Sequence, residues 1–489
     1  MLFITIDFLI FFILILSLVF VIKYRKFQHI FLLIVSYFFF YYTSNYLVIL
    51  LIYSTLMDFF IGKQIWKTQK IRDKKILLII SLVGNLGLLG FFKYADFAIL
   101  QFNYLGEQFN LANDIPFLNL ALPIGISFYT FQTISYTVDI YRGKLKPSES
   151  LREFALFVAF FPQLVAGPIV RASEFLPQLR EKVQNFETNH KIKQIIFQNS
   201  NLKLGITLMI IGFFKKMFFA DNIAPVANEI FSNPYGLESF TIILGAIAFG
   251  LQIYGDFSGY TDIAIGAALI LGFKLPINFN KPYFATSPSD FWRRWHISLS
   301  SWLRDYLYIP LGGNKKGSKF TYANLMIVMF LGGLWHGASW NFIIWGVLHG
   351  SYLAVHKILV NKFPSLANNL FFKTKSGKIL SIFVTQYFIF LAWIAFRVKD
   401  MDAMIYSFTK YIILDFEISG TIEFILVHKL AIGIMSLFII LNFISYKKDM
   451  KKMIVNLKLR YWILVLVIPI LLILLFFDAT PNDFIYFQF

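Results

Sequence analysis

Long apolar runs recur along this chain, from Leu2–Ile22 near its start to Tyr461–Phe477 near its end. A helix needs roughly 20 such residues to cross the hydrocarbon core of a bilayer. Hydrophobic residues make up 58% of the 489 residues and charged residues only 15%, more apolar surface than a soluble domain buries. The sequence therefore predicts an all-α integral membrane protein, a single polytopic domain over residues 1–489, with about eleven transmembrane helices plus re-entrant or surface helices. The first run lacks a basic start and a cleavage site, which favours a retained helix over a signal peptide.

The positive charge of the chain is concentrated in short loops. The formal net charge is +18, and basic residues cluster at Lys23–Lys26, Lys63–Lys75 and Tyr446–Lys452. This is the positive-inside pattern of membrane proteins, and it argues against a nucleic-acid partner. With these loops cytoplasmic, the chain is a multi-pass protein of the cell (inner, cytoplasmic) membrane whose N- and C-termini are extracytoplasmic. There is no Cys, which excludes disulfides, thiolate metal sites and a thioester held on the chain.

Two stretches of the first half break the apolar pattern. Residues 27–62 fit two short helices interrupted near Thr43–Asn45. Residues 171–203 mix charge with apolar positions and predict an amphipathic surface helix and loop. The apolar positions of that stretch are Phe175, Leu176, Leu179, Ile192, Ile195 and Ile196.

Two carboxylates interrupt the apolar run that begins near residue 252. Asp256 and Asp262 would be costly at membrane depth unless they line a cavity or pair with a cation. A functional site and a structural lock through Tyr254, Tyr260 or a nearby Arg are equally favoured. At positions i and i+6 they do not form an obvious carboxylate pair on one helix face.

The stretch SPSDFWRRWHISLSSWLRDYLYIPLGG predicts one helix with Ser289 as its N-cap. His296 lies in its middle. A lone histidine of this kind is more often a hydrogen-bonded packing residue than a catalyst. The helix is too charged to face lipid, and its apolar side chains recur at helical spacing on one face: Trp292, Trp295, Leu299 and Trp302.

A second histidine lies in the apolar stretch LGGLWHGASWNFIIWGVLHG. Small residues around His336, such as Gly333 and Gly337, permit close approach of another backbone or a ligand. On a continuous helix, His336 shares a face with Trp340, whereas His349 points to another side. No HExxH motif and no neighbouring carboxylate accompany these histidines, so a metal site is not expected.

Together these stretches resemble the membrane-bound O-acyltransferases, in particular the bacterial branch of alginate and peptidoglycan O-acetyltransferases, which is related to the teichoic-acid D-alanyl transferase. The resemblance covers roughly the middle half of the chain, in order. The matching segments are residues 86–97, 122–143, 160–171, 254–266, 291–313 and 334–350.

The resemblance implies a ring of tilted helices around a tunnel that narrows at a catalytic histidine. His336 matches the essential histidine of the family, and His296 matches its second active-site position. A histidine with a near-neutral pKa suits the removal of a proton from an attacking hydroxyl. The implied function is transfer of an acyl group, in this branch commonly acetyl, from a cytoplasmic donor such as acetyl-CoA to an alginate-like exopolysaccharide or peptidoglycan. No bound cofactor is expected. The candidates for lining the tunnel or binding the donor are Trp292, Arg293, Arg294, Trp295, Asp256 and Trp340.

Basic residues in and after the WRRWH stretch are candidates for contact with a phosphorylated donor at the cytoplasmic mouth. Positive-inside topology alone is the competing explanation for each lysine. The candidates are Arg293, Arg294, Lys315, Lys316 and Lys319.

The chain ends in the aromatic hexapeptide FIYFQF, residues 484–489, which is expected outside the membrane. It is either an interfacial anchor or, by resemblance to the small partner peptide of the D-alanylation machinery, an acyl carrier. In the second case the Tyr486 hydroxyl receives the acyl group, and an extracytoplasmic SGNH-type transferase collects it. An oxygen ester would suit a chain without Cys.

Two other classes of protein are compatible with the same residues. One is a polytopic transporter in which His296, His336 and Asp256 form a proton relay. The absence of visible inverted repeats counts against it. The other is a membrane scaffold whose histidines only pack. An acyl-transfer assay of a His336→Ala variant separates the enzyme from both.

Overall fold

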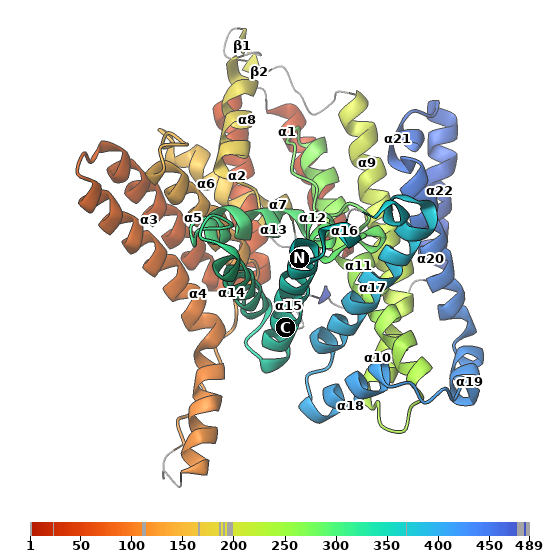
Figure 1. Cartoon of the computed structure of the whole chain (residues 1–489). Coiled ribbons are helices and arrows are strands. Elements are labelled where there is room, and N and C mark those ends of the chain that lie inside the picture. Colours follow the sequence, from red (N-terminus) through yellow and green to blue (C-terminus); the bar gives the residue numbers. More distant parts are fainter. Residues whose placement is uncertain are drawn as a thin grey trace. The chain divides into compact units, whose positions relative to one another are not determined.

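The computed structural model is almost entirely helical (Figure 1). It describes residues 2–22, 24–109, 114–164, 167–184, 187–188, 191–192, 199–367, 369–476 and 484–485. The chain divides into two compact units. Unit 1 comprises Met1–Ile206 with Ala264–Pro276, and unit 2 comprises Thr207–Ile263 with Ile277–Phe489. The single-domain organisation of residues 1–489 stays a prediction.

Six helical segments of the described chain are long and apolar enough to cross a membrane. Two shorter apolar helices, Ile6–Val21 and Leu459–Leu475, accompany them. The all-α membrane class is therefore confirmed, while the number of crossings near eleven stays a prediction. The six segments are Lys26–Lys67, Ile71–Gln108, Ser239–Ile270, Trp340–Lys362, Lys375–Arg397 and Lys429–Lys447.

Unit 1 is a helical assembly with one short hairpin. The expected break near Thr43–Asn45 is present: a helix ends at Ser44, and Asn45 has φ 51°. The surface helix expected after residue 171 is α8, although Ile195 and Ile196 lie outside the described residues. The elements are α1 (Ile6–Val21), α2 (Arg25–Ser44), η1 (Asn45–Leu47), α3 (Val48–Lys67), α4 (Ile71–Gln108), α5 (Ile126–Tyr141), α6 (Leu151–Ala159), α7 (Phe161–Leu164), α8 (Ala172–Gln184), β1 (Glu187–Thr188) and β2 (Lys191–Ile192). α9 (Asn199–Phe213) and α11 (Ser239–Ile270) contribute to both units.

A buried polar network ties α3 to α4 within unit 1. The Asp58 carboxylate accepts hydrogen bonds from the Ser81 hydroxyl at 2.6 Å and the Asn85 amide at 2.7 Å. The Ser54 hydroxyl donates to the Asn85 side-chain oxygen at 2.5 Å. Because buried polar groups cost free energy unless they are hydrogen-bonded, this mutual satisfaction fixes the register of the two helices.

Unit 2 holds both histidine-bearing stretches. Two of its elements, η2 and η4, are π-helical turns, a rare geometry that is frequent at functional sites. Its elements are η2 (Phe214–Ala220), α10 (Asp221–Ser232), η3 (Pro282–Phe284), α12 (Pro288–Arg294), α13 (Ile297–Leu303), η4 (Arg304–Tyr308), α14 (Ser318–His336), α15 (Trp340–Lys362), α16 (Pro364–Ala367), η5 (Leu370–Lys373), α17 (Lys375–Arg397), α18 (Met401–Ile412), α19 (Ser419–Val427), α20 (Lys429–Lys447), α21 (Met450–Val455) and α22 (Leu459–Leu475).

Glycines allow α14 and α15 to pack backbone against backbone. A Cβ added at Gly333 would overlap the Phe342 carbonyl oxygen, and one added at Gly346 would overlap the Met329 carbonyl oxygen. The close approach expected from small residues in this stretch is therefore real. The close approach does not depend on glycine at position 332, because a Cβ there would contact only a leucine side chain at ordinary distance.

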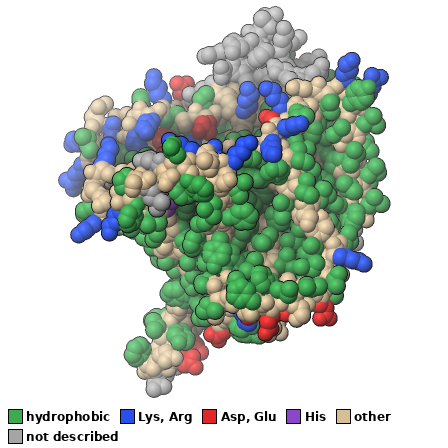
Figure 2. All heavy atoms as spheres, turned by 45° about the vertical axis from the view of Figure 1, so that its right-hand side comes forward, with side chains coloured by type: hydrophobic (Ala, Val, Ile, Leu, Met, Phe, Trp, Pro, Cys, Tyr) green, Lys and Arg blue, Asp and Glu red, His purple; other side chains and the backbone are tan. Residues whose placement is uncertain are grey.

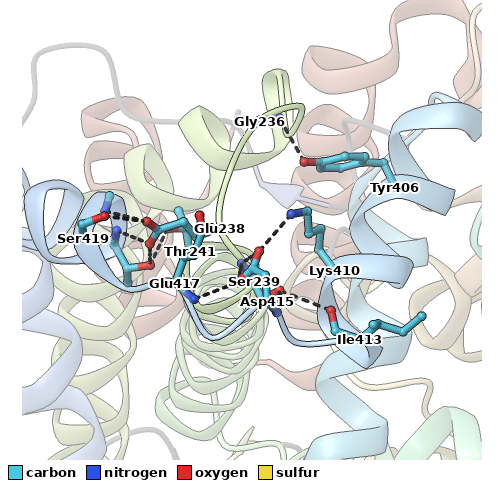
Figure 3. Close-up of polar contacts among 12 residues, drawn as sticks. Gly236, Glu238, Ser239, Thr241, Tyr406, Lys410, Ile413, Asp415, Glu417 and Ser419 are labelled. Carbon is cyan, nitrogen blue, oxygen red and sulfur yellow. Dashed lines mark hydrogen bonds and ion pairs between the residues drawn. The ribbon is translucent and has the colours of Figure 1, made fainter.

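Two acidic side chains lock the loop before α11 to the loop before α19 (Figure 3). Glu238 accepts the backbone N–H groups of Gly420 at 2.7 Å and Thr421 at 2.8 Å, at the first turn of α19. Asp415 accepts the Ser239 N–H at the start of α11 and pairs with Lys410 at 2.9 Å. Carboxylates at helix N-termini satisfy donors that have no partner inside the helix.

The surface of the molecule is apolar over broad areas. Hydrophobic side chains cover most of the face shown in Figure 2. Within unit 2, exposed large apolar residues recur along the helices α20 and α22, for example Leu464, Ile468 and Leu475. Apolar patches of this extent are not found on soluble monomers, and they are the surface that a lipid environment requires.

Candidate active site

The histidine of the WRRWH stretch lies at a break between α12 and α13. His296 has φ 42° and ψ 55°, in the left-handed region that side chains other than glycine seldom adopt. The prediction of one continuous helix capped by Ser289 is therefore wrong. The N-cap of α12 is Ser287, whose hydroxyl accepts the Asp290 N–H at 3.1 Å. Because the chain turns at His296, the four apolar residues predicted to share one helix face do not lie on one helix: Trp292 is in α12, Trp295 follows its end, and Leu299 and Trp302 are in α13.

Asn278 holds the buried ring of His296. The side chain of His296 is inaccessible to solvent, and its Nδ1 lies 3.3 Å from the side-chain oxygen of Asn278. The Phe257 ring packs against the imidazole with a centroid distance of 4.7 Å. Burial lowers the pKa of His296 to about 3, below the near-neutral value expected from sequence, because the charged ring would lose its hydration. The ring is therefore neutral at physiological pH.

His336 is the last residue of α14, and a tryptophan separates it from His296. The Trp335 ring lies 5.0 Å from the His336 ring and 5.9 Å from the His296 ring. α15 begins at Trp340, so His336 and Trp340 do not share a helix face as predicted. Trp340 is 50% exposed. The structure thus brings the two predicted catalytic histidines to one ring, while Trp340 is half exposed.

A third histidine approaches the same aromatic cluster. The Trp345 ring contacts both His336, at 4.9 Å, and His349, at 4.6 Å. The prediction that these two histidines point to different sides assumed one helix. It is wrong because the chain reverses between α14 and α15.

The candidate tryptophans Trp292, in α12, and Trp295, directly after it, both pack into this cluster. The Trp292 ring lies 5.1 Å from His349 and 5.7 Å from Trp345. Trp295 is 1% exposed and its ring lies 5.0 Å from that of Trp393. The described surroundings of the histidines are therefore mainly aromatic and shielded from water.

Lysines, rather than an arginine or tyrosines, neutralise the two aspartates of α11. Lys216 lies 3.3 Å from Asp256 and 2.7 Å from Asp221. Asp262 pairs with Lys215 at 2.7 Å and with Lys451 at 2.6 Å. The π-helical turn η2 carries both adjacent lysines.

The first residues of the C-terminal hexapeptide are buried beside this charge cluster. The Ile485 N–H donates to Asp256 at 2.7 Å. Phe484 is fully buried, with its ring 4.2 Å from Tyr260 and 5.8 Å from Phe257. Since Phe257 also contacts His296, the chain enters the hexapeptide next to the histidine site. Tyr486 lies outside the described residues.

The basic donor-binding candidates lie at the surface. Arg293 is exposed, and Arg294 pairs with Asp290 at 2.9 Å on the same helix. The candidate lysines of the loop after η4 and the start of α14, Lys315, Lys316 and Lys319, are exposed as well. Exposed charge of this kind is compatible with donor binding and with positive-inside topology alike. Among the described residues there is no group of His, Asp and Glu that could hold a metal ion.

Sequence reasoning missed Asn278 and the Lys215–Lys216 pair. Two adjacent lysines within the apolar stretch around residue 212 were a visible signal, because an intramembrane cation needs a counter-charge. Asn278 had no such signal. Its importance comes from a tertiary contact with a residue eighteen positions later.

The described part of the chain is an almost entirely helical membrane protein with a buried, aromatic, histidine-containing site. It belongs to the family described as MBOAT, membrane-bound O-acyltransferase, whose model matches residues 144–398. The chain is therefore a membrane O-acyltransferase.

Individual relatives are similar over most of their length. The peptidoglycan O-acetyltransferase of Helicobacter pylori is 41% identical over 377 residues, which cover 72% of this chain and 68% of the relative. A probable alginate O-acetylase AlgI of Pseudomonas aeruginosa is 38% identical over 384 residues, which cover 77% of this chain and 68% of the relative. The teichoic acid D-alanyltransferase of Bacillus subtilis is 29% identical over 295 residues, which cover 58% of this chain and 70% of the relative.

Proposed function

We propose that this protein passes an acyl group, acetyl in the first instance, from a cytoplasmic thioester such as acetyl-CoA across the membrane for O-acetylation of a cell-surface polysaccharide. The relatives named for O-acetylation of peptidoglycan or alginate support this substrate class. The protein would act in the bacterial inner membrane as one polytopic domain, with both termini extracytoplasmic. Family membership favours this enzyme over the transporter and the scaffold.

The observation that carries the proposal is the convergence of His336 and His296 on the Trp335 ring. Acyl transfer from a thioester to a hydroxyl requires a group that takes the hydroxyl proton as the new ester bond forms. The carbon–sulfur bond of the thioester then breaks, and the proton passes to the departing thiolate, which leaves as the free thiol of the donor. We assign that step to His336, with His296 assisting. The aromatic surroundings provided by Trp292 and Trp295 would exclude water, which would otherwise hydrolyse the thioester.

The C-terminal hexapeptide is proposed to carry the acyl group outward. Ile485 is held at Asp256, and Phe484 shares the Phe257 ring with His296. Tyr486 follows Ile485 directly in the sequence. Its hydroxyl would receive the acyl group as an oxygen ester, and an extracytoplasmic SGNH-type transferase would pass the group to the polymer.

For the donor, we propose that some of the exposed basic residues meet the phosphates of acyl-CoA. Arg293 is the first candidate, because it is exposed and lies on α12, the helix that also carries Trp292 and leads into Trp295. Its replacement by Gln should raise the KM for acetyl-CoA, and the effect should diminish at high salt. Unchanged donor kinetics would leave Arg293 with a topological role only.

A His336→Ala variant tests the central claim. Membrane vesicles supplied with labelled acetyl-CoA should lose acetyl transfer by at least about 100-fold, the lower range for removal of an acid–base group. The matched control is His356→Ala, because His356 also lies in unit 2 and is only partly buried. Both variants are first checked for normal amounts in the membrane. Transfer by His336→Ala at the control level would refute the assignment.

A Tyr486→Phe variant tests the carrier separately. It keeps the aromatic ring and removes only the nucleophilic hydroxyl, so polymer acetylation should stop while folding is preserved. Mass spectrometry of the C-terminal peptide should detect an acetyl ester on Tyr486 that accumulates when the downstream transferase is absent. Full polymer acetylation by Tyr486→Phe would reduce the hexapeptide to an anchor.

A further inference from the structure

The side-chain oxygen of Asn278 makes three polar contacts. It accepts the backbone N–H of Ser298 at 3.1 Å and the Ser298 hydroxyl at 2.8 Å, and it faces Nδ1 of His296 at 3.3 Å. Asn278 is 1% exposed, Ser298 is 5% exposed and His296 is fully buried. The contacts thus form within the protein and out of solvent.

The backbone N–H of Ser298 fixes the orientation of the Asn278 amide. If the oxygen and nitrogen of this amide exchanged places, its NH₂ group would point at the N–H, and two donors would face each other. The atom facing Nδ1 of His296 must therefore be the oxygen. A carbonyl oxygen is only an acceptor, so the proton of the neutral imidazole must lie on Nδ1 for this contact to be favourable.

We infer that Asn278 is a positioning residue that holds His296 in the tautomer with the proton on Nδ1 and the lone pair on Nε2. This inference rests on the proposed function only for its catalytic consequence. A neutral His296 then accepts a hydrogen bond at Nε2 and cannot donate one there. In acyl transfer, His296 would therefore accept a hydrogen bond from the acceptor hydroxyl. It would not stabilise the oxyanion that develops on the acyl carbonyl, because that requires a donor.

The same residue also secures the unusual backbone at His296. The Ile297 N–H donates to the Asn278 carbonyl at 2.9 Å, and the Asn280 N–H donates to the Arg294 carbonyl at 2.9 Å. These bonds bracket the left-handed residue on both sides. A left-handed conformation is unfavourable for a residue with a side chain, so it persists where its surroundings impose it. Segment 278–280 therefore fixes both the position of the ring and its protonation pattern.

Nitrogen-15 NMR of histidine-labelled protein reads the tautomer directly. The chain has seven histidines, and a spectrum of His296→Gln identifies the resonances of His296 by their loss. We expect a protonated, pyrrole-type Nδ1 and an unprotonated, pyridine-type Nε2 in the unmodified protein. The reverse pattern would overturn the inference without any reference to activity.

Two substitutions at Asn278 separate positioning from folding. Asn278→Asp keeps an acceptor oxygen, and the amide nitrogen that it replaces makes no hydrogen bond within the described part of the chain. Asn278→Leu removes the acceptor. We expect Asn278→Asp to keep the Nδ1-protonated tautomer and much of the activity, and Asn278→Leu to lose the fixed tautomer and to lower kcat on the order of 100-fold. Asn324→Leu is the matched control, because it removes another buried asparagine of unit 2, bound to the Gly313 carbonyl.

The titration of the His296 ring itself supplies a second readout. A carboxylate introduced beside Nδ1–H would favour the charged ring, so the pKa of His296, followed through its own nitrogen-15 resonances, should be higher in Asn278→Asp than in the unmodified protein. The described contacts of the ring include Phe257 of α11, Trp335 of α14 and Asn278, and the charged neighbour of Phe257, Asp256, is paired with Lys216. An unshifted pKa of His296 in Asn278→Asp together with an unchanged tautomer in Asn278→Leu would overturn the inference.

The outcomes distinguish this inference from the proposed function. If the NMR pattern depends on Asn278 but His296→Gln retains full transfer, the tautomer assignment stands and the catalytic role of His296 fails. If His296→Gln is inactive but Asn278→Leu leaves the tautomer and kcat unchanged, the catalytic role stands and the positioning role fails.

Discussion

Lys216 offers the sharpest test of how unit 2 is stabilised. Its ammonium group is 1% exposed and lies 2.7 Å from Asp221 and 3.3 Å from Asp256. The cluster therefore places one positive charge between two carboxylates. Asp256 also accepts the N–H of Ile485, so the same charge cluster holds the C-terminal segment. We predict that Lys216→Met and Asp256→Asn, which remove opposite charges, have very unequal effects.

The expected magnitudes follow from the charge that each substitution leaves behind. Lys216→Met removes the cation that pairs with the buried Asp256 and the partly buried Asp221, and breaking a buried ion pair in this way costs about 3–5 kcal/mol. Asp256→Asn leaves a balanced pair of Lys216 and Asp221, and the asparagine oxygen can still accept the N–H of Ile485. Its cost should be that of one neutral-for-charged hydrogen bond, about 1 kcal/mol. The double variant Lys216→Met/Asp256→Asn should be more stable than Lys216→Met alone.

The matched control is Lys451→Met. Lys451 also pairs with an aspartate of α11, but its side chain is 40% exposed and Asp262 keeps Lys215 as a partner. An exposed pair contributes at most about 1 kcal/mol. The assay is thermal unfolding of the purified protein in detergent, followed by tryptophan fluorescence. At roughly 2 °C per kcal/mol, Lys216→Met should lower Tm by about 6–10 °C and the control by about 2 °C or less. Equal shifts for the two lysine variants would refute the reasoning.

Three further predictions address packing and caps. Gly346→Val should prevent the α14–α15 hairpin from closing, because any Cβ overlaps the Met329 carbonyl; loss of the protein from the membrane fraction would be the readout. Ser287→Ala should cost about 1 kcal/mol by removing the cap of α12, measured as a lower Tm, and an unchanged Tm would contradict the cap. Glu238→Gln should speed hydrogen exchange in the first turn of α19. The bond from the Gly420 N–H lowers the pKa of Glu238 below its usual 4.5, so this contribution is present above pH 4.5 and lost as the pH falls. In the unmodified protein the protection factor of these amides, which is the exchange rate corrected for its intrinsic pH dependence, should therefore fall in acid.

Much of the fold follows from the sequence because the bilayer simplifies the problem. Apolar runs long enough to cross it predict helices, and the break between α2 and α3 at Ser44–Asn45 occurs where the polar residues predicted it. The close packing at Gly333 also follows from residue size. These features depend on local sequence, so local reasoning recovers them.

The geometry around the histidines does not follow from the sequence, since it depends on three departures from helical periodicity. The chain turns at His296, it reverses after His336, and η2 is a π-helical turn that carries Lys216 toward Asp256. Assigning faces at 100° per residue presumes an unbroken helix. It therefore separated His336 from His349 and gave no indication that Lys216 faces Asp256.

These departures from periodicity are themselves informative about function. A left-handed histidine and a π-helical turn both cost free energy, and such costs persist where surrounding contacts impose them. Here the imposing contacts are Asn278 at His296 and the aspartates at Lys216. The contacts around His296 include Phe257 of α11, and those around Lys216 include the neighbouring residue Asp256. The buried start of the hexapeptide contacts the same helix. Predictions from helical periodicity are thus wrong at one place in unit 2. This is expected for a functional site, whose structure is determined by its chemistry as well as by stability. If these departures from periodicity served only the stability of the fold, His296→Gln and Asn278→Leu would lower Tm without changing the rate of acyl transfer by the folded protein.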